Sequence, residues 1–287
     1  MIEVVALDQA VQDPTARHIV PLSGGKDSTA LAVLMLQKYP NLPFEFLFTD
    51  TGAELPETYE YFKKFETIFD VKITRLTALD LPRFRAREKD GRRIPFDYVL
   101  DEVYSGFLPN PQARWCTRVL KIQPFEQFVG DDRAYSYIGI RDDENRVGYG
   151  GVGRSHSHTF SAERRAKPVV LSEKSNIMPV YPFKDLGMSL DEIKRVLDES
   201  GLGLPAYYEW RSRSGCYFCF YQQIGEWQGL RERHPELFRQ AKTYEKVENG
   251  RAYTWSEGRS LTDIEKLKQR HANPVGEDLD GCAICHL

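Results

Sequence analysis

The chain has 287 residues, a formal net charge of −3 and 41% hydrophobic residues. This length accommodates one large α/β domain, or one domain with a smaller appendage. The near-neutral charge argues against a dedicated nucleic-acid-binding protein, which is usually clearly basic. No apolar run reaches the roughly 18 residues of a membrane-spanning helix, and residues 1–5 lack a basic, apolar leader. We therefore expect a cytoplasmic protein without a membrane partner.

A glycine-rich turn lies near the N-terminus and reads Ser23-Gly24-Gly25-Lys26-Asp27-Ser28. It follows an apolar run at 17–22, which predicts a buried strand, and it opens into residues 27–39, which predict a helix. Two glycines let the backbone approach an anion, and a helix N-terminus favours negative charge. The serine hydroxyls and the lysine cation add donors. These features predict a phosphate cradle that differs from the Walker pattern.

Strand and helix patterns alternate after this turn. Residues 44–49 and 72–76 predict strands that flank a helix ending near residue 69, and a further strand is expected at 135–140. This order predicts an α/β fold with a doubly wound, mostly parallel sheet and helices on both faces. Helical patterns at 222–247 and 261–271 predict a helical C-terminal extension. We divide the chain into a nucleotide-binding α/β domain (1–210) and a cysteine-containing helical region (211–287).

The Ser23–Ser28 turn resembles the PP-loop, SGGxDS, of the adenine nucleotide alpha hydrolases. Members of that superfamily bind ATP or an adenylyl sulfate there, and many cleave ATP between the alpha and beta phosphates. Later segments resemble its phosphoadenylyl sulfate reductase-like branch. Asp50–Thr58 resembles DTG…PET, Arg114–Pro124 resembles C-x-x-x-x-K-x-x-P, and Gly139–Arg146 resembles G-x-R-x-x-E-S/N-x-x-R in a compressed form. From the residues alone, 50–58 also fits a capped turn and 141–146 a solvated charged turn.

The resemblance implies a set of site residues, together with Mg²⁺ as the partner of ATP. The ATP-binding residues are Ser23, Gly24, Gly25, Lys26, Asp27, Ser28, Asp50, Thr51, Gly52 and Gly139. Lys26, Asp27, Arg141 and Arg146 are the catalytic candidates. The two arginines suit this role because guanidinium groups bind oxyanions bidentately. Arg114, Arg118 and Lys121 are expected on one helix face, where they place positive charge near phosphate or sulfate.

Five cysteines include the pairs Cys216-x-x-Cys219 and Cys282-x-x-Cys285. In a cytosolic chain such pairs indicate metal, cluster or thiol chemistry before disulfides, and two pairs can bind zinc. Related adenylyl sulfate reductases hold a [4Fe-4S] cluster with cysteines at corresponding places. The resemblance therefore implies Cys116, Cys216 and Cys219 as cluster ligands, with Cys285 or Cys282 as the fourth. Cys282 is also a candidate sulfur relay, and zinc or unligated thiols remain open.

The Arg114-Trp115-Cys116 segment and the Gly215-Cys216-x-x-Cys219 segment, without the reductases' E-C-G-x-H tail, look most like the ATP pyrophosphatase component of bacterial DNA phosphorothioation systems. This resemblance implies cleavage of ATP to AMP and pyrophosphate and adenylation of the DNA backbone phosphate for sulfur incorporation. The implied partners are a cysteine desulfurase, other proteins of a modification complex, and DNA through that complex. The alternatives are a sulfonucleotide reductase that uses a tail cysteine, a tRNA-thiolation enzyme, and a nucleotide-sensing subunit.

Overall fold

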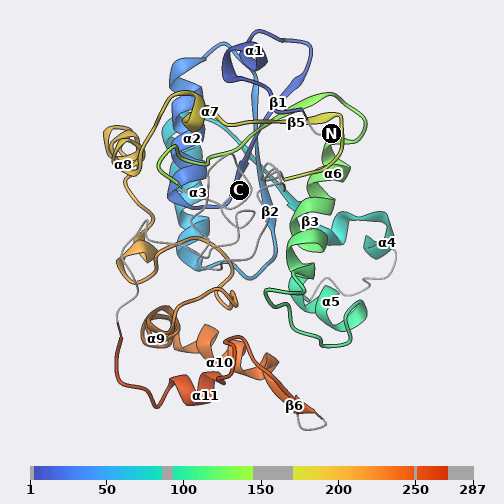
Figure 1. Ribbon diagram of the computed structural model, residues 1–287, viewed down its shortest axis with the longest axis vertical. Coiled ribbons are helices and arrows are strands. Elements are labelled where there is room, and N and C mark those ends of the chain that lie inside the picture. The colour runs from blue at the N-terminus through green and yellow to red at the C-terminus, as the bar shows by residue number, and fades with distance from the viewer. Residues whose placement is uncertain (1–2, 86–92, 145–170, 249–250, 271–287) are drawn as a thin grey trace, which may run out of the picture.

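The computed structural model describes residues 3–85, 93–144, 171–248 and 251–270. A five-stranded parallel sheet lies at its centre, with the strand order β3-β2-β1-β4-β5 (Figure 1). The strands are β1 (Arg17–Leu22), β2 (Phe44–Asp50), β3 (Ile73–Thr77), β4 (Ala134–Tyr137) and β5 (Ile177–Val180).

Helices cover both faces of this sheet. Along β1, Val20 and Leu22 point into one core, whereas Ile19 points into the other, because successive side chains on a strand alternate between faces. The first core also contains residues of α2 (Lys26–Lys38), α3 (Pro56–Phe69) and α8 (Leu190–Glu199), and the second contains residues of α6 (Gln123–Val129). The predicted doubly wound α/β fold is confirmed.

A short helix precedes the first strand. Residues Leu7–Val11 form this helix, α1. Leu7 and Ala10 are buried in the core, and the N–H of Leu7 donates to Asp185 Oδ2 at 2.7 Å. Burial against the rest of the chain, rather than local propensity, therefore orders this helix.

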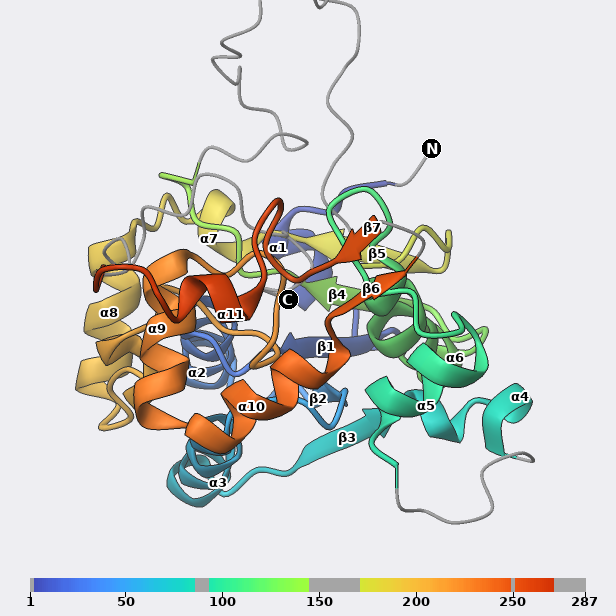
Figure 2. The ribbon, with the colours of Figure 1, turned by 90° about the horizontal axis from the view of Figure 1, so that it is seen from below.

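The C-terminal helices α9 (Ile224–Arg233), α10 (Pro235–Tyr244) and α11 (Leu261–Ile264) lie together below the sheet (Figures 1 and 2). With them lies the antiparallel hairpin of β6 (Lys246–Glu248) and β7 (Arg251–Tyr253). Their core is shared with earlier residues: Trp227 and Phe238 belong to the same cluster as Phe96 and Trp115. The packing of this helical extension therefore involves residues on both sides of position 210, where the sequence places a domain boundary.

The remaining elements are connections between these layers. They are η1 (Ala78–Asp80), α4 (Pro82–Arg85), α5 (Pro95–Glu102), the π-helical η2 (Thr117–Ile122), α7 (Pro182–Asp185) and η3 (Ala206–Glu209). Within the described ranges, no helix has the length and apolar content that crossing a bilayer requires.

The strand order reverses between β1 and β4. The chain proceeds from β1 to β2 and β3 on one side, and then returns to β4 on the other side of β1. Open α/β sheets bind ligands at such a switch point. The Ser23–Ser28 turn follows β1, and Gly139–Arg141 follow β4, so both predicted site segments lie at this switch point.

Candidate active site

The Ser23–Ser28 turn requires glycine at two positions. Gly24 has a φ of +75°, and a Cβ added there would lie 2.5 Å from Thr58 Cγ2. A Cβ on Gly25 would lie 2.6 Å from Ser214 Oγ. The turn is thus enclosed on one side by α3 and on the other by the segment that leads to Cys216, and only glycine leaves room for both neighbours.

Hydroxyl and N–H groups converge in the turn. Ser23 Oγ lies 3.0 Å from Ser28 Oγ and accepts a hydrogen bond from the N–H of Gly25 at 3.3 Å. Both serines are buried, and α2 begins at Lys26. Oriented donors at a helix N-terminus form an anion-binding site. The fold therefore brings together the groups of the predicted cradle.

Asp27 connects the two cations of the site. Its Oδ2 lies 2.9 Å from Lys26 Nζ and its Oδ1 lies 2.7 Å from Arg141 Nη1, and all three side chains are at most 5% exposed. Burial alone would raise the pKa of Asp27, but Lys26 and Arg141 outweigh burial and hold this pKa below its usual value. Burial would lower the pKa of Lys26, yet Tyr208 and Asp27 keep it raised. The three groups carry a net positive charge, which favours a phosphate anion nearby.

The absence of a side chain at Gly139 allows the segment after β4 to place Arg141 beside the cradle. A Cβ on Gly139 would lie 3.1 Å from the carbonyl oxygen of Asp27, so the backbone after β4 approaches the first turn of α2 closely. Arg141 follows and also donates through Nε to Asp143 Oδ1 at 2.9 Å. Arg146, the other predicted catalytic arginine, lies outside the described residues.

The segment after β2 forms a second wall. Asp50 Oδ1 accepts hydrogen bonds from the N–H of Gly52 at 2.8 Å and from the hydroxyl of Tyr59 at 2.9 Å. Gly52 has a φ of +74°, and a Cβ there would lie 2.7 Å from Ile94 Cβ. Asp50 therefore caps a tight turn, as one of the two sequence interpretations predicts. Asp50, one of the predicted ATP-binding residues, is itself partly exposed.

Thr51 and Glu54 connect this wall to the cysteines. Thr51 Oγ1 donates to Glu54 Oε1 at 2.8 Å and lies 3.3 Å from Cys216 Sγ. Burial and the neighbouring Asp50 raise the pKa of Glu54 to about 7. Burial, followed by the proximity of Glu54, also raises the pKa of the Cys216 thiol, while Lys121 opposes this shift.

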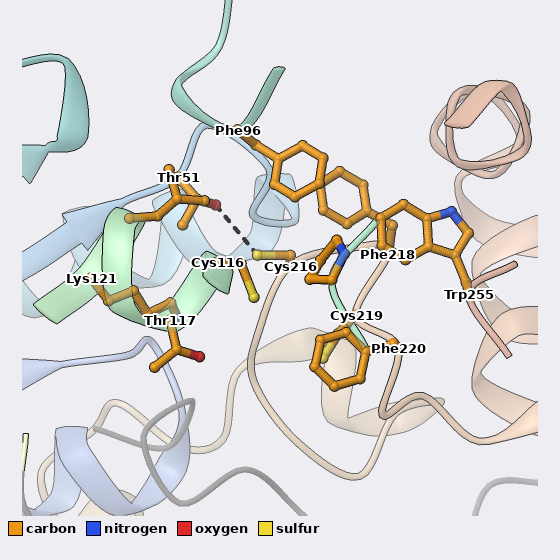
Figure 3. Close-up of a pocket in the computed structure, with 12 residues that line it drawn as sticks. Thr51, Phe96, Cys116, Thr117, Lys121, Cys216, Phe218, Cys219, Phe220 and Trp255 are labelled. Carbon is orange, nitrogen blue, oxygen red and sulfur yellow. Dashed lines mark hydrogen bonds between the residues drawn. The ribbon is translucent and has the colours of Figure 1, made fainter. Parts of the chain in front are cut away.

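Cys116, Cys216 and Cys219 line one pocket, which we call the cysteine pocket (Figure 3). The Cys116 side chain comes from the start of the helix that leads into η2, and the other two come from the loop after η3. Arg213 Nη2 donates to Cys219 Sγ at 3.6 Å. The other residues that line the pocket are Thr51, Phe96, Pro109, Thr117, Leu120, Lys121, Phe218, Phe220 and Trp255. The three predicted thiols thus meet, although Cys116 is 100 positions from Cys216.

The three basic residues of the 114–124 segment do not share one helix face. Arg114 precedes the helix and is exposed, and Thr117–Ile122 are π-helical, so the α-helical spacing that the prediction assumed does not hold. Arg118 pairs with Glu126 at 3.1 Å. Only Lys121, which is 9% exposed, lines the cysteine pocket.

A family model described as the phosphoadenosine phosphosulfate reductase domain matches residues 17–228. The chain belongs to this family. The phosphoadenosine phosphosulfate reductase domain contains the cradle, the Asp27 cluster and the three described cysteines, since all lie between residues 17 and 228. The match therefore covers the whole candidate site as the structure describes it.

Curated relatives of this domain include Uncharacterized protein MJ0066 of Methanocaldococcus jannaschii, 24% identical over 225 residues, which are 77% of this chain and 39% of that protein. Uncharacterized protein MJ0973 of the same organism is 24% identical over 220 residues, 75% of this chain and 44% of that protein. An uncharacterized nin region protein, ORF290 of Escherichia phage lambda, is 28% identical over 141 residues, 44% of this chain and 49% of that protein. The chain spans less than half the length of each.

Two solved structures resemble this phosphoadenosine phosphosulfate reductase domain. The phosphoadenylyl-sulfate reductase of Candida auris is 11% identical, with a TM-score of 0.46, over 75% of this chain and 98% of that chain. The U34-tRNA thiolase NcsA of Methanococcus maripaludis, solved with its [4Fe-4S] cluster, is 14% identical, with a TM-score of 0.43, over 98% of this chain and 83% of that chain.

Three of the predicted cluster ligands, Cys116, Cys216 and Cys219, line the largely apolar cysteine pocket, with Lys121 beside them. In the described ranges, no three His, Cys, Asp or Glu side chains are arranged so that they could hold a metal ion. Cys282 and Cys285, the candidates for the fourth ligand and the sulfur relay, lie outside the described residues.

Sequence reasoning did not assign Glu54, Tyr208 and Ser214 to the site. The hydroxyl of Tyr208 accepts from the N–H of Lys26 at 3.2 Å, and Lys26 Nζ lies 5.6 Å from the centre of its ring. Tyr208 and Ser214 are distant in sequence from the cradle residues that they contact, so no local pattern marks them. Glu54 lies between Gly52 and Pro56, in a predicted site segment that follows a buried strand. Its position in that segment was the one sequence feature that could have assigned it to the site.

Proposed function

We propose that the protein is an ATP pyrophosphatase that adenylates an acceptor so that sulfur can be incorporated into it. The observation that carries this proposal is the adjacency of two sites. Ser214 Oγ lies 3.3 Å from Ser23 Oγ in the cradle, and Cys216, two positions further along, lines the cysteine pocket. The cradle, which would bind the phosphates, and the cysteine pocket, which would take part in sulfur transfer, would therefore act on the same bound molecule.

The cradle would hold the phosphates of ATP, and Mg²⁺ would accompany them. Mg²⁺ is usually bound through one or two carboxylates together with substrate phosphates. Both carboxylate oxygens of Asp27 are engaged by Lys26 and Arg141. Asp50 is therefore the better candidate for an Mg²⁺ ligand than Asp27, and Asp27 acts as the group that positions the two cations.

The proposed reaction is a nucleotidyl transfer. An acceptor oxygen attacks the alpha phosphorus, the bond from that phosphorus to the oxygen bridging it to the beta phosphorus breaks, and pyrophosphate leaves. Negative charge grows on the departing pyrophosphate, and the preorganised cations Lys26 and Arg141 stabilise it. Their burial strengthens this effect, since fixed charges act more strongly where water is excluded.

The cysteine pocket would serve the sulfur step. Cys116, Cys216, Cys219 and one tail cysteine would hold the [4Fe-4S] cluster, which supplies a site for electron or sulfide transfer when it is bound. Lys121 would offset the negative charge of the thiolates, and Thr51 would orient Cys216 through its hydroxyl. The proposed acceptor is the DNA backbone phosphate, with sulfur supplied by a cysteine desulfurase within a modification complex.

Product analysis with two substrates tests the reaction. The protein is incubated with Mg²⁺ and either ATP or phosphoadenylyl sulfate, alongside Ser23→Ala and a control, Ser200→Ala, whose hydroxyl bonds Leu197 at a helix end. We expect AMP and pyrophosphate from ATP with the wild type and the control, and neither from Ser23→Ala. Sulfite from phosphoadenylyl sulfate, with ATP unchanged, would overturn the proposal in favour of a reductase.

The tail cysteines separate the two reactions independently. A reductase with a tail nucleophile loses all turnover in Cys282→Ser or Cys285→Ser, whereas ATP cleavage in the proposed reaction survives both changes.

The acceptor is tested with radiolabelled cysteine sulfur, a cysteine desulfurase, ATP, DNA and transfer RNA in one mixture. Label in DNA supports the proposed acceptor, and label in transfer RNA alone assigns the enzyme to tRNA thiolation.

A further inference from the structure

The segment from Tyr207 to Cys216 packs directly over the PP-loop. The hydroxyl of Tyr207 donates to the carbonyl of Gly24 at 2.7 Å, and the N–H of Lys26 donates to the hydroxyl of Tyr208 at 3.2 Å. The loop and this segment are more than 180 positions apart in the sequence. Side chains of this segment therefore form part of the cradle that the glycine-rich turn begins.

Ser214 contacts the part of the cradle that contains Ser23 and Gly25. Its hydroxyl donates to Ser23 Oγ at 3.3 Å, and its Oγ lies 2.6 Å from the place where a Cβ on Gly25 would be. The residue is only 2% exposed. Its hydroxyl therefore occupies the space beside Gly25 that the absent side chain leaves open, and it lies next to the hydroxyl of Ser23.

The backbone around Ser214 is held in place. Arg211, which is 1% exposed, donates to the carbonyls of Gly215 at 3.1 Å and Cys216 at 2.9 Å. Ser212 donates through its N–H and its hydroxyl to Glu226 Oε1, at 2.7 and 2.8 Å. Donors that are fixed before a ligand arrives bind it without a further ordering cost.

We propose that Ser214 is a further binding residue for the phosphate group in the PP-loop. A hydroxyl rotates freely, so a phosphate oxygen in the cradle can replace Ser23 Oγ as the acceptor of the Ser214 hydrogen bond. This inference rests on the proposed function, because it requires a nucleotide phosphate in the loop. It extends the phosphate site from the turn at 23–28 to the segment that carries Cys216 and Cys219.

Calorimetric titration of Ser214→Ala tests the inference. The probes are inorganic pyrophosphate, ATP and adenosine, and Ser172→Ala is the matched control, because that serine is similarly buried and also donates to a glutamate, Glu126, but lies outside the Tyr207–Cys216 segment. A hydrogen bond to a charged group contributes enough that its loss should weaken pyrophosphate and ATP binding about 10- to 100-fold. The control should retain the wild-type affinities, and adenosine, which has no phosphate, should bind both variants as it binds the wild type.

The possible outcomes separate this inference from the proposed function. If wild type and Ser214→Ala bind pyrophosphate and ATP equally, the inference is wrong and the proposed function stands. If adenosine binding falls by the same factor as pyrophosphate binding, Ser214 has a structural role and the inference is likewise overturned. If the wild type binds neither pyrophosphate nor ATP, the proposed function fails, and the inference fails with it.

Discussion

Arg141 Nη1 donates to Asp27 Oδ1 at 2.7 Å and so joins the segment after β4 to the first turn of α2. The contact joins segments on the two sides of the switch point in the strand order, and both side chains are buried. A buried cation of this kind is stable only with its counter-ion in place. The position of Arg141 in the cradle therefore depends on Asp27, and the two residues act as a unit.

Asp27→Asn should destabilise the protein and abolish ATP turnover. The change removes the negative charge between Lys26 and Arg141, and breaking a buried pair in this way costs about 3–5 kcal/mol of unfolding free energy. The measurement is denaturant unfolding. Asp143→Asn is the matched control, since Asp143 also binds Arg141 but is 44% exposed, and its loss should cost below about 1 kcal/mol. Equal costs for the two variants would contradict this account.

Gly24→Ala should cost more stability than Gly201→Ala. Both glycines have a positive φ, +75° and +78°, so both changes carry the left-handed penalty of about 1–2 kcal/mol. Only the Cβ at position 24 meets a neighbour, Thr58 Cγ2, whereas nothing lies within 4 Å at position 201. The difference should be about 1–3 kcal/mol in chemical denaturation. Thr58→Ser removes that methyl group and should recover part of the loss, and no recovery would argue against the contact.

The elements that carry local patterns were predictable, and the long-range contacts were not. The apolar run of β1, the helix after Gly25 and the segment after β2 each have a local pattern, and the structure places them close to their expected bounds. Ser214 reaches Ser23 across 191 positions, which no periodicity reveals. The arrangement of Arg114, Arg118 and Lys121 could not be predicted either, because an α-helical spacing was assumed for residues that are π-helical.

Anaerobically purified protein should contain iron, about four atoms per chain for a [4Fe-4S] cluster, and show the broad visible absorbance of such a cluster. Cys216→Ser should lose both, because it removes one of the thiols at the cysteine pocket. Thr117→Ser, a conservative change in the same pocket wall, should keep both. Zinc without iron in the wild type would contradict the cluster.

Acidification below neutral pH should reduce stability through His18. His18 is buried in β1, where burial lowers its pKa below the usual 6.5 although the carbonyl and charge of Asp13 oppose the shift. Below about pH 6.5 the unfolded chain therefore takes up a proton that the folded protein does not, and the free energy of unfolding falls until the lowered pKa is reached. Urea unfolding at a series of pH values gives the free energy of unfolding as a function of pH, and this free energy should fall less steeply on acidification in His18→Gln than in the wild type. An equally steep fall in both proteins would assign the acid sensitivity to other groups.

The most direct measurement is the fate of the gamma phosphate of labelled ATP. With Mg²⁺ and the wild-type protein, the label should appear in intact pyrophosphate with an equal amount of AMP, because the proposed site directs attack to the alpha phosphorus. Ser23→Ala and Asp27→Asn should release neither product. Label in orthophosphate with formation of ADP would contradict the central claim, because it would place the cleavage between the beta and gamma phosphates.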